Sequence, residues 1–203
     1  MPGKGGCVEE GLKPTPSCVD VGIDQISAYL LGWIVGDGGL YKLSYSGGRT
    51  EYRVVVTQKD LSTVTRCLAP LFESLCSMLN VASKVRILTG STRVEVRVSS
   101  KRLYEHFTSL LTRLPEFTES ERRLFIAGFY MAEGEKSGRR VRMWNKDIQL
   151  LKLIGSWLRE FGIEKFSIYL DDKRHGVYVL EIPSRYRHLF FNIWGLETPC
   201  DLY

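Results

Sequence analysis

The sequence lacks the features that would place the chain in a membrane or in the secretory pathway. Its two longest apolar runs, 28–36 and 124–132, are nine residues each, whereas a membrane-spanning helix needs about 20. Its first residues do not show the charged and then apolar layout of a signal peptide. We therefore expect a protein that stays in the cytoplasm, in the cytosol or at the nucleoid, and has no membrane partner.

Cysteine and histidine are scarce, and neither shows the spacing of a metal site. The five cysteines are odd in number and include no C-x-x-C pair, so the sequence indicates neither a zinc site nor a disulfide framework. Cys67 and Cys76 have apolar neighbours, and we expect both to be buried helix residues. The chain has only three histidines, and no two of them have metal-ligand spacing.

The composition is that of an ordinary folded protein with a mild basic excess. The length of 203 residues is enough for one large domain or two small ones. Of these residues, 44% are hydrophobic and 25% are charged, as in ordinary folded proteins. Lys and Arg number 28 against 23 acids, and the resulting net charge of +5 favours an anionic partner without naming one. Eleven of the basic residues fall in 84–102 and 136–146, which contain very few acids.

The most informative feature of the chain is an internal repeat. The segment 26–38 matches the segment 122–134, and both place a glycine, an acid and a second glycine in the same frame. Each copy is followed by a strand-like stretch, a helix-period segment (61–80 or 148–162), two alternating strands and a final helix. We therefore expect an α+β fold with two pseudo-symmetric αββαββα halves in tandem. The boundaries are a flexible tail at 1–22, a first half at 23–113, a linker at 114–117 and a second half at 118–203.

Each apolar run ends in an acid followed by glycine. This pattern is typical of a helix whose following residue adopts the left-handed conformation, so we expect that conformation at Gly38 and Gly134. A carboxylate at the negative end of a helix dipole costs about 0.3 to 1 kcal/mol. Because the same unfavourable choice occurs at matched positions, Asp37 and Glu133 are candidate functional residues.

Small residues explain how the two acids would meet. Gly32 and Gly36 are one helical turn apart, and Gly128 and Ala132 occupy the matching places in the second copy. Such residues let two helices approach closely, which would bring Asp37 and Glu133 side by side. Two adjacent carboxylates repel each other, and Mg²⁺ prefers this kind of oxygen ligand. The arrangement predicts metal-assisted phosphodiester hydrolysis.

Alternation along the predicted strands places arginines and other polar side chains on one face and valines on the other. A face of this composition suits a duplex groove, because arginine binds guanine with two hydrogen bonds and glutamate accepts one from cytosine. The residues predicted on this face are Arg49, Glu51, Arg53, Thr57, Arg93, Glu95, Arg97 and Ser99 in the first half, and Arg140, Arg142, Trp144, Tyr169 and Asp171 in the second. Tyr41, Lys42 and Arg139 are further candidates for DNA binding.

Among these residues, Arg53, Arg97 and Arg142 are candidates for base readout. Lys59, Lys101 and Lys146 are candidates for phosphate contacts, as are Arg174 and His175 in the polar turn 171–176. His106 and His188 lie among aromatic residues and are expected to be core or surface residues of helices.

The segments 30–38 and 126–134 resemble the two signature helices of the LAGLIDADG homing endonucleases. The resemblance covers about residues 23–196 and is strongest to the compact, archaeal, intron-encoded monomers of that family. Shared stretches include 36–42, with Tyr41 and Lys42, as well as 51–55, 57–59, 97–101, 144–146 and 175–180. Val35 and Met131 stand where the signature has its first acid, and Glu133 replaces an aspartate.

The resemblance implies a monomer whose two antiparallel sheets form a saddle on a long, asymmetric double-stranded DNA site, with the signature helices at the interface. It implies cleavage of both strands across the minor groove, which leaves short 3′ overhangs. Asp37 and Glu133, with the carbonyls of Gly36 and Ala132, would bind two or three Mg²⁺ ions, and Mn²⁺ would substitute for Mg²⁺. Gln58 and Asn145 would order water at the scissile phosphates, and Lys136 would lie near them as a basic catalytic residue.

A second hypothesis belongs to a different class, that of binding modules. The chain could be a maturase that binds intron RNA, or a DNA-binding protein that has lost catalysis. Retention of both acids, Gln58 and Lys136 argues against a decayed nuclease, but a maturase can keep them. A self-splicing intein is not indicated, because the chain neither starts with Cys or Ser nor ends with His-Asn.

Overall fold

The computed structural model describes residues 22–135 and 139–193. The first half begins with a helix that contains the first copy of the repeat, followed by a hairpin, a helical segment, a second hairpin and a helix. In order, these elements are α1 (Ile23–Asp37), β1 (Gly38–Ser44), β2 (Thr50–Gln58), α2 (Leu61–Thr63), the π-helical turn η1 (Val64–Leu68), α3 (Ala69–Met78), β3 (Val85–Thr89), β4 (Val94–Ser99) and α4 (Lys101–Thr112).

A short 3₁₀ turn, η2 (Leu114–Glu116), joins the halves. The second half contains α5 (Glu119–Glu133), β5 (Val141–Asn145), α6 (Ile148–Glu160), β6 (Ser167–Asp172), β7 (Val177–Ile182), the 3₁₀ turn η3 (Ser184–Tyr186) and α7 (Arg187–Ile193). Helix α5 starts with a capping box: Thr118 accepts from the backbone N–H of Glu121, whose carboxylate accepts from the N–H of Thr118. The first half thus shows the predicted αββαββα order, whereas the described residues of the second half lack the strand expected directly after its first helix.

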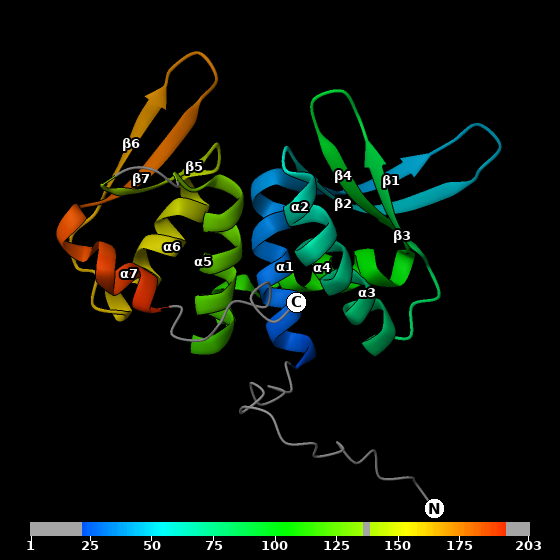
Figure 1. Cartoon of the computed structure of the whole chain (residues 1–203), viewed down its shortest axis with the longest axis horizontal. Coiled ribbons are helices and arrows are strands. Elements are labelled where there is room, and N and C mark those ends of the chain that lie inside the picture. The colour runs from blue at the N-terminus through cyan, green and yellow to red at the C-terminus, as the bar shows by residue number, and fades with distance from the viewer. Residues whose placement is uncertain (1–21, 136–138, 194–203) are drawn as a thin grey trace, which may run out of the picture.

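Two antiparallel sheets form separately, one in each half. The first has the strand order β1-β2-β4-β3, and the second has the order β5-β7-β6. Figure 1 shows α1 and α5 side by side at the centre, with the hairpins of the two sheets rising on either side of their C-terminal ends. The expected α+β class with two antiparallel sheets is thus confirmed.

The second half pairs fewer residues after its first helix than the first half does. In the first half, β1 pairs with β2 from Gly38 opposite Val56 to Ser44 opposite Thr50. At the matching place in the second half, the described residues show a single bridge between Gly134 and Met143. Only seven residues separate α5 from β5, which is too short a segment for a hairpin of the size seen in the first half.

The interface between α1 and α5 depends on glycine. A Cβ atom at Gly32 would collide with the backbone of Phe125 and Phe129, and one at Gly128 would collide with the carbonyl oxygen of Tyr29. A Cβ at Gly36 would lie 2.6 Å from that of Ala132. The expected close approach of the two helices at their small residues is confirmed.

Large aromatic side chains surround this glycine contact. Tyr29 and Trp33 of α1 and Phe125 and Phe129 of α5 are almost completely buried, and they belong to one hydrophobic core that extends through both halves. Phe125 stacks on Phe129 with ring centroids 6.2 Å apart, and it meets Trp157 of α6 edge to face. Because the core is continuous, the two halves stabilise each other.

The left-handed conformation expected after each helix is absent, and that expectation was wrong. Gly38 has φ −141° and Gly134 has φ −87°, so both are extended. Glycine is needed there because space is short. A Cβ at Gly38 would collide with the carbonyl oxygen of Val55, and one at Gly134 would collide with Tyr130. In each half, the backbone passes directly from the helix into an extended segment that pairs with a strand. The acid therefore lies at the junction between the helix and this segment.

Two other expectations can be compared with the described residues. Cys67 and Cys76 are buried helix residues as predicted, but Cys67 is disulfide-bonded, which the cysteine pattern did not indicate, whereas Cys76 is a free thiol. Within 22–135 and 139–193, none of the helices is both long and apolar enough to cross a membrane.

The glycine interface yields a stability prediction. Gly128→Ala should lower the free energy of unfolding by about 2 to 3 kcal/mol, because the added methyl group must separate two backbones. Gly22→Ala is the comparison variant: nothing lies within 4 Å of its Cβ position, so it should lose only the preference for glycine over alanine at the N-cap of α1, about 0.5 to 1 kcal/mol. Urea denaturation measures both values. Equal, small effects of the two substitutions would show that the helices are not in backbone contact.

Candidate functional site

Asp37 and Glu133 are the last residues of α1 and α5, so the glycine interface carries both acids to the same end of the helix pair. Neither helix has a basic residue in its last turn to offset the helix dipole. Burial, with a smaller contribution from the nearby charge of Asp37, raises the pKa of Glu133 to about 7. The site therefore concentrates negative charge at the centre of the molecule.

A cavity of about 340 Å³ opens beside the first acid. It is lined by Asp37, by Thr57, Gln58 and Lys59 at the end of β2, by Arg93, and by Ala132 from the opposite helix. Within it, the side-chain amide of Gln58 donates a hydrogen bond of 2.6 Å to Asp37 Oδ2. The last residue of the strand thus orients the last residue of the helix.

A second cavity, of about 350 Å³, opens beside the other acid. It is lined by Val35, Gly36, Glu133, Trp144, Asn145, Lys146 and Val177. The two cavities have matching compositions: each combines an acid, the small residue before the other acid, a strand-end amide and a lysine. The repeat in the sequence has therefore become a repeated pocket.

The two pockets differ in the bonding of their amide side chains. Gln58 bonds to Asp37, whereas Asn145 Oδ1 accepts a hydrogen bond of 2.8 Å from the backbone N–H of Asp147, which caps α6. Asn145 thus serves the turn that leads into α6. Lys136, the basic catalytic candidate, lies outside the described residues.

The donor set of the two pockets fits a hard divalent cation. Among the described residues there is no cluster of three His, Cys, Asp or Glu side chains that could enclose a metal. Mg²⁺ does not need such a cluster, because it commonly binds one or two protein carboxylates and completes its octahedron with water and phosphate oxygens. The carboxylates of Asp37 and Glu133 and the backbone carbonyls of Gly36 and Ala132 are oxygen donors of this kind, beside cavities with room for other ligands.

The outer face of the first sheet carries a polar network centred on Glu51. Its carboxylate accepts two hydrogen bonds of 2.8 Å from Arg53 and bonds of 2.9 Å from Tyr45 and Ser99. The bond from Arg53, with those from Tyr45 and Ser99, lowers the pKa of Glu51 to about 2. Glu51 is thus ionised and saturated with donors, and Arg53 is held by a glutamate on its own strand.

The other predicted residues of the first half divide between the two faces of the sheet. Glu95 and Arg97 form an ion pair of 2.6 Å on β4, and Arg97 lies opposite Val55, next to the Arg53–Ser99 pair. Lys42 pairs with Tyr52, so strand alternation turns it away from Tyr41 and Arg53. The Nζ atoms of Lys42 and Lys101 lie 5.9 and 6.0 Å from the Tyr52 ring centroid. These two lysines therefore lie on the other side of the sheet from Arg53 and Arg97. The exposed Arg49 precedes β2.

The second sheet has a hub of the same kind that sequence reasoning missed. Glu181 of β7 accepts hydrogen bonds from Arg140, from Arg142 at 2.7 Å and from Tyr169 at 3.2 Å. Burial by itself would raise the pKa of Glu181, but the hydrogen bonds from Arg142 and Arg140 outweigh it and hold that pKa below its usual range. The apolar residues Leu180 and Ile182 on either side of Glu181 face the core, and this alternation was the signal that could have placed Glu181 on the outer face.

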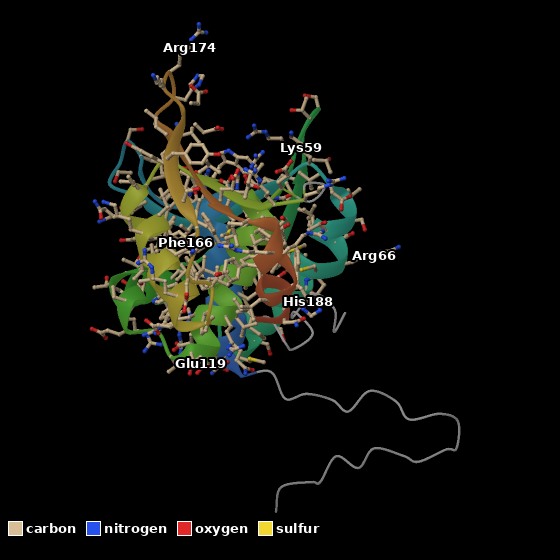
Figure 2. The ribbon with its side chains drawn as sticks, turned by 90° about the vertical axis from the view of Figure 1, so that its left-hand side faces the viewer. Lys59, Arg66, Glu119, Phe166, Arg174 and His188 are labelled. Atoms are coloured by element: carbon tan, nitrogen blue, oxygen red, sulfur yellow. The ribbon has the colours of Figure 1, made fainter. Side chains whose placement is uncertain are left out.

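The remaining predicted residues of the second half surround this hub or lie at the hairpin tip. Trp144 donates a hydrogen bond of 3.0 Å from its indole nitrogen to Asp171, and Arg139 is exposed just before β5. In the β6–β7 turn, Asp172 accepts from the backbone N–H groups of Arg174 and His175 and contacts the His175 ring at 2.6 Å. Figure 2 shows Arg174 and Lys59 toward the same end of the molecule and Glu119 at the opposite end.

The other two histidines lie away from this end of the molecule. His106 is half-buried and shares a 2.8 Å hydrogen bond with the hydroxyl of Ser27. Burial lowers the pKa of His106. His188 is exposed on α7.

Known proteins match this chain in sequence and in structure. Residues 120–195 match the family model of the LAGLIDADG-like domain. The chain is 51% identical to the homing endonuclease I-DmoI of Desulfurococcus mucosus over 83% of this chain and 86% of that protein. A crystal structure of an I-DmoI variant, solved with its target DNA in the presence of manganese, superimposes with a TM-score of 0.84 and 48% identity over 87% of this chain and 97% of the other. The N-terminal LAGLIDADG domain of DUF199/WhiA, at 14% identity and a TM-score of 0.59 over 88% and 87% of the two chains, shares the fold alone.

The raised pKa of Glu133 predicts how stability depends on pH without metal. An acid whose pKa is higher folded than unfolded makes the folded state bind more protons, so stability falls as pH rises from about 4.5 to about 7. Glu133→Gln removes this loss. In a chelating buffer its melting temperature should rise relative to wild type between about pH 5 and about pH 8.

The matched control for that experiment is Glu164→Gln, which changes an exposed glutamate in the loop between α6 and β6. The melting temperature of Glu164→Gln should follow that of the wild type across this pH range. If the difference in melting temperature between Glu133→Gln and wild type does not change with pH, then Glu133 is not buried beside Asp37 as described above.

Proposed function

The chain belongs to the LAGLIDADG homing endonuclease family, and from that premise we propose that it is a site-specific, divalent-metal-dependent DNA endonuclease with Asp37 and Glu133 as its metal ligands. The observation that carries the proposal is the pair of matched pockets, each with one of these acids at its edge. Solved structures of I-DmoI include complexes with DNA and manganese, with target DNA in the presence of magnesium, and with DNA and calcium. The oxygen donors found here suit the same ions.

Two pockets and one acid interface match the requirements of double-strand cleavage. A bound Mg²⁺ ion would polarise the scissile phosphate and supply an activated water as the nucleophile. The chain's own contribution is to hold two carboxylates at the helix junctions and to keep Asp37 oriented through Gln58. Lys59 and Lys146 line the two pockets and would offset the charge of the phosphates. With one scissile phosphate in each pocket, the enzyme would cut both strands across the minor groove and leave short 3′ overhangs.

The sheets supply the binding surface for a long, asymmetric duplex. Their outer faces carry Arg53 and Arg97 in the first half and Arg140 and Arg142 in the second, each beside an acid. The two halves differ in sequence and in strand number, so a symmetric site would not satisfy both of them. Lys42 and Lys101, which lie on the other face of the first sheet, are not part of this proposed surface.

The enzyme acts as a monomer, because α1 and α5 belong to the same chain. Their interface is therefore complete without a second copy of the protein. Because its substrate is DNA, the enzyme works at the nucleoid in the cytoplasm.

Substitution of the acids tests the proposal directly. Asp37→Asn and Glu133→Gln should each abolish Mg²⁺-dependent cutting of the selected target while changing its Kd by less than about threefold, because the acids face metal rather than bases. Glu164→Gln is the control and should cut like wild type. Gel analysis of plasmid cleavage and fluorescence titration of a labelled duplex provide the two readouts.

Full cleavage by the variant that carries both substitutions would contradict the proposed metal ligands. A wild-type protein that binds host intron RNA tightly, and that does not nick DNA in Mg²⁺, would instead be a maturase. In that case the endonuclease proposal would fail for this chain, although its membership of the family would stand.

A further inference from the structure

The acid hub of the second sheet is built differently from an ordinary surface ion pair. The side chain of Glu181 is only 10% exposed, while those of Arg140 and Arg142 are 57% and 36% exposed. The carboxylate therefore lies beneath two guanidinium groups that reach toward solvent. A nearly buried acid is costly unless it is paired and fully hydrogen-bonded, so this arrangement requires both arginines.

The bonding fixes the direction of each arginine. Arg140 bonds to Oε1 of Glu181, and Arg142 bonds through Nε to Oε2 at 2.7 Å. Arg142 also lies 3.6 Å from Glu135, so acids flank its guanidinium on two sides. The hydroxyl of Tyr169, on the far strand of the sheet, donates to Oε2 at 3.2 Å. Glu181 thus joins all three strands of the sheet on the face that is turned away from the helices.

The first sheet repeats the design with different residues. There Glu51 holds Arg53 with two hydrogen bonds and also accepts from Tyr45 and Ser99. In both sheets, a glutamate with several donors bonds to at least one arginine, and a tyrosine hydroxyl is among its donors. Exposed ion pairs contribute little to stability, so the recurrence of this costly arrangement points to a use other than folding.

We propose that Glu181 is a positioning residue for base recognition, whose carboxylate holds Arg140 and Arg142 in one arrangement before DNA binds. This inference rests on the proposed function and extends it. An unrestrained arginine binds any phosphate, whereas base discrimination needs its planar fork held at a defined angle to a base edge. The acid also repels the DNA backbone, so Glu181 lowers affinity for random sequence while it raises discrimination.

The experiment compares wild type, Glu181→Gln and Glu119→Gln. Glu119 also pairs with an arginine, Arg123, but it lies at the opposite end of the molecule from the sheet surfaces, as Figure 2 shows. Each protein selects from a library of randomised duplexes without divalent metal, so that binding is measured and cutting does not occur. Sequencing of the bound duplexes gives discrimination at each base pair.

Glu181→Gln should reduce discrimination about fivefold or more at base pairs contacted by the second sheet and leave the half contacted by the first sheet unchanged. Its affinity for unselected duplex should rise. The slope of log K against log salt should steepen by up to about 0.9, the value for one added phosphate contact. Glu119→Gln should match wild type in all three measurements.

Glu181→Asp keeps the charge but shortens the reach of the carboxylate. It should show the salt dependence of wild type together with weakened discrimination in the second half of the site. Thermal melting of each variant confirms that it is folded.

Three results would overturn the proposal: an unchanged selection profile for Glu181→Gln, an equal loss in both halves of the site, or wild-type discrimination by Glu181→Asp. If wild type itself selects no sequence, then the endonuclease proposal fails as well. The two failures are therefore distinguishable.

Discussion

The close approach of α1 and α5 is the constraint on which the rest of the molecule depends. Glycines at positions 32 and 128 allow backbone contact where any Cβ atom would collide with the opposite helix. This contact joins the cores of the two halves and also determines where Asp37 and Glu133 emerge. Structure and site are therefore the same feature, and a change that separates the helices would disturb both.

Electrostatic opposition is the second organising principle. At the centre, two acids lie together without basic residues in their own helix ends, and burial and mutual repulsion raise the pKa of Glu133 to about 7. On the sheet surfaces the reverse holds, because arginines predominate and Glu51, Glu95 and Glu181 each accept a hydrogen bond from an arginine. The centre is thus prepared for cations and the flanks for an anion, which matches a metal-dependent enzyme that acts on DNA.

Much of this could be predicted from the sequence, because the repeat is strong and the small residues in it have a single steric purpose. The division into halves follows from the repeat. The helix interface and the adjacency of Asp37 and Glu133 follow from small residues one helical turn apart in each copy. Glu181 was missed because its partners Arg140 and Arg142 are about 40 residues earlier in the chain, and only the pairing of β5 with β7 brings them together. The conformation of Gly38 and Gly134 was wrongly predicted because helix-end statistics do not include the extended pairing that follows each helix, nor the atoms of Val55 and Tyr130 that would collide with a side chain there. Tyr41 and Lys42 are neighbours on β1 and therefore point to opposite faces of the sheet, which a shared stretch of sequence does not show.

In the proposed enzyme, the interface between α1 and α5 serves two separate pockets, one for each DNA strand. The most direct measurement is strand-resolved cleavage of a duplex labelled differently at its two ends, with Gln58→Ala and Asn145→Ala compared to wild type. Each amide lines only one of the two acid pockets. The two substitutions should slow the cutting of opposite strands. If both slow the same strand, or both strands equally, then the pockets do not work as separate half-sites.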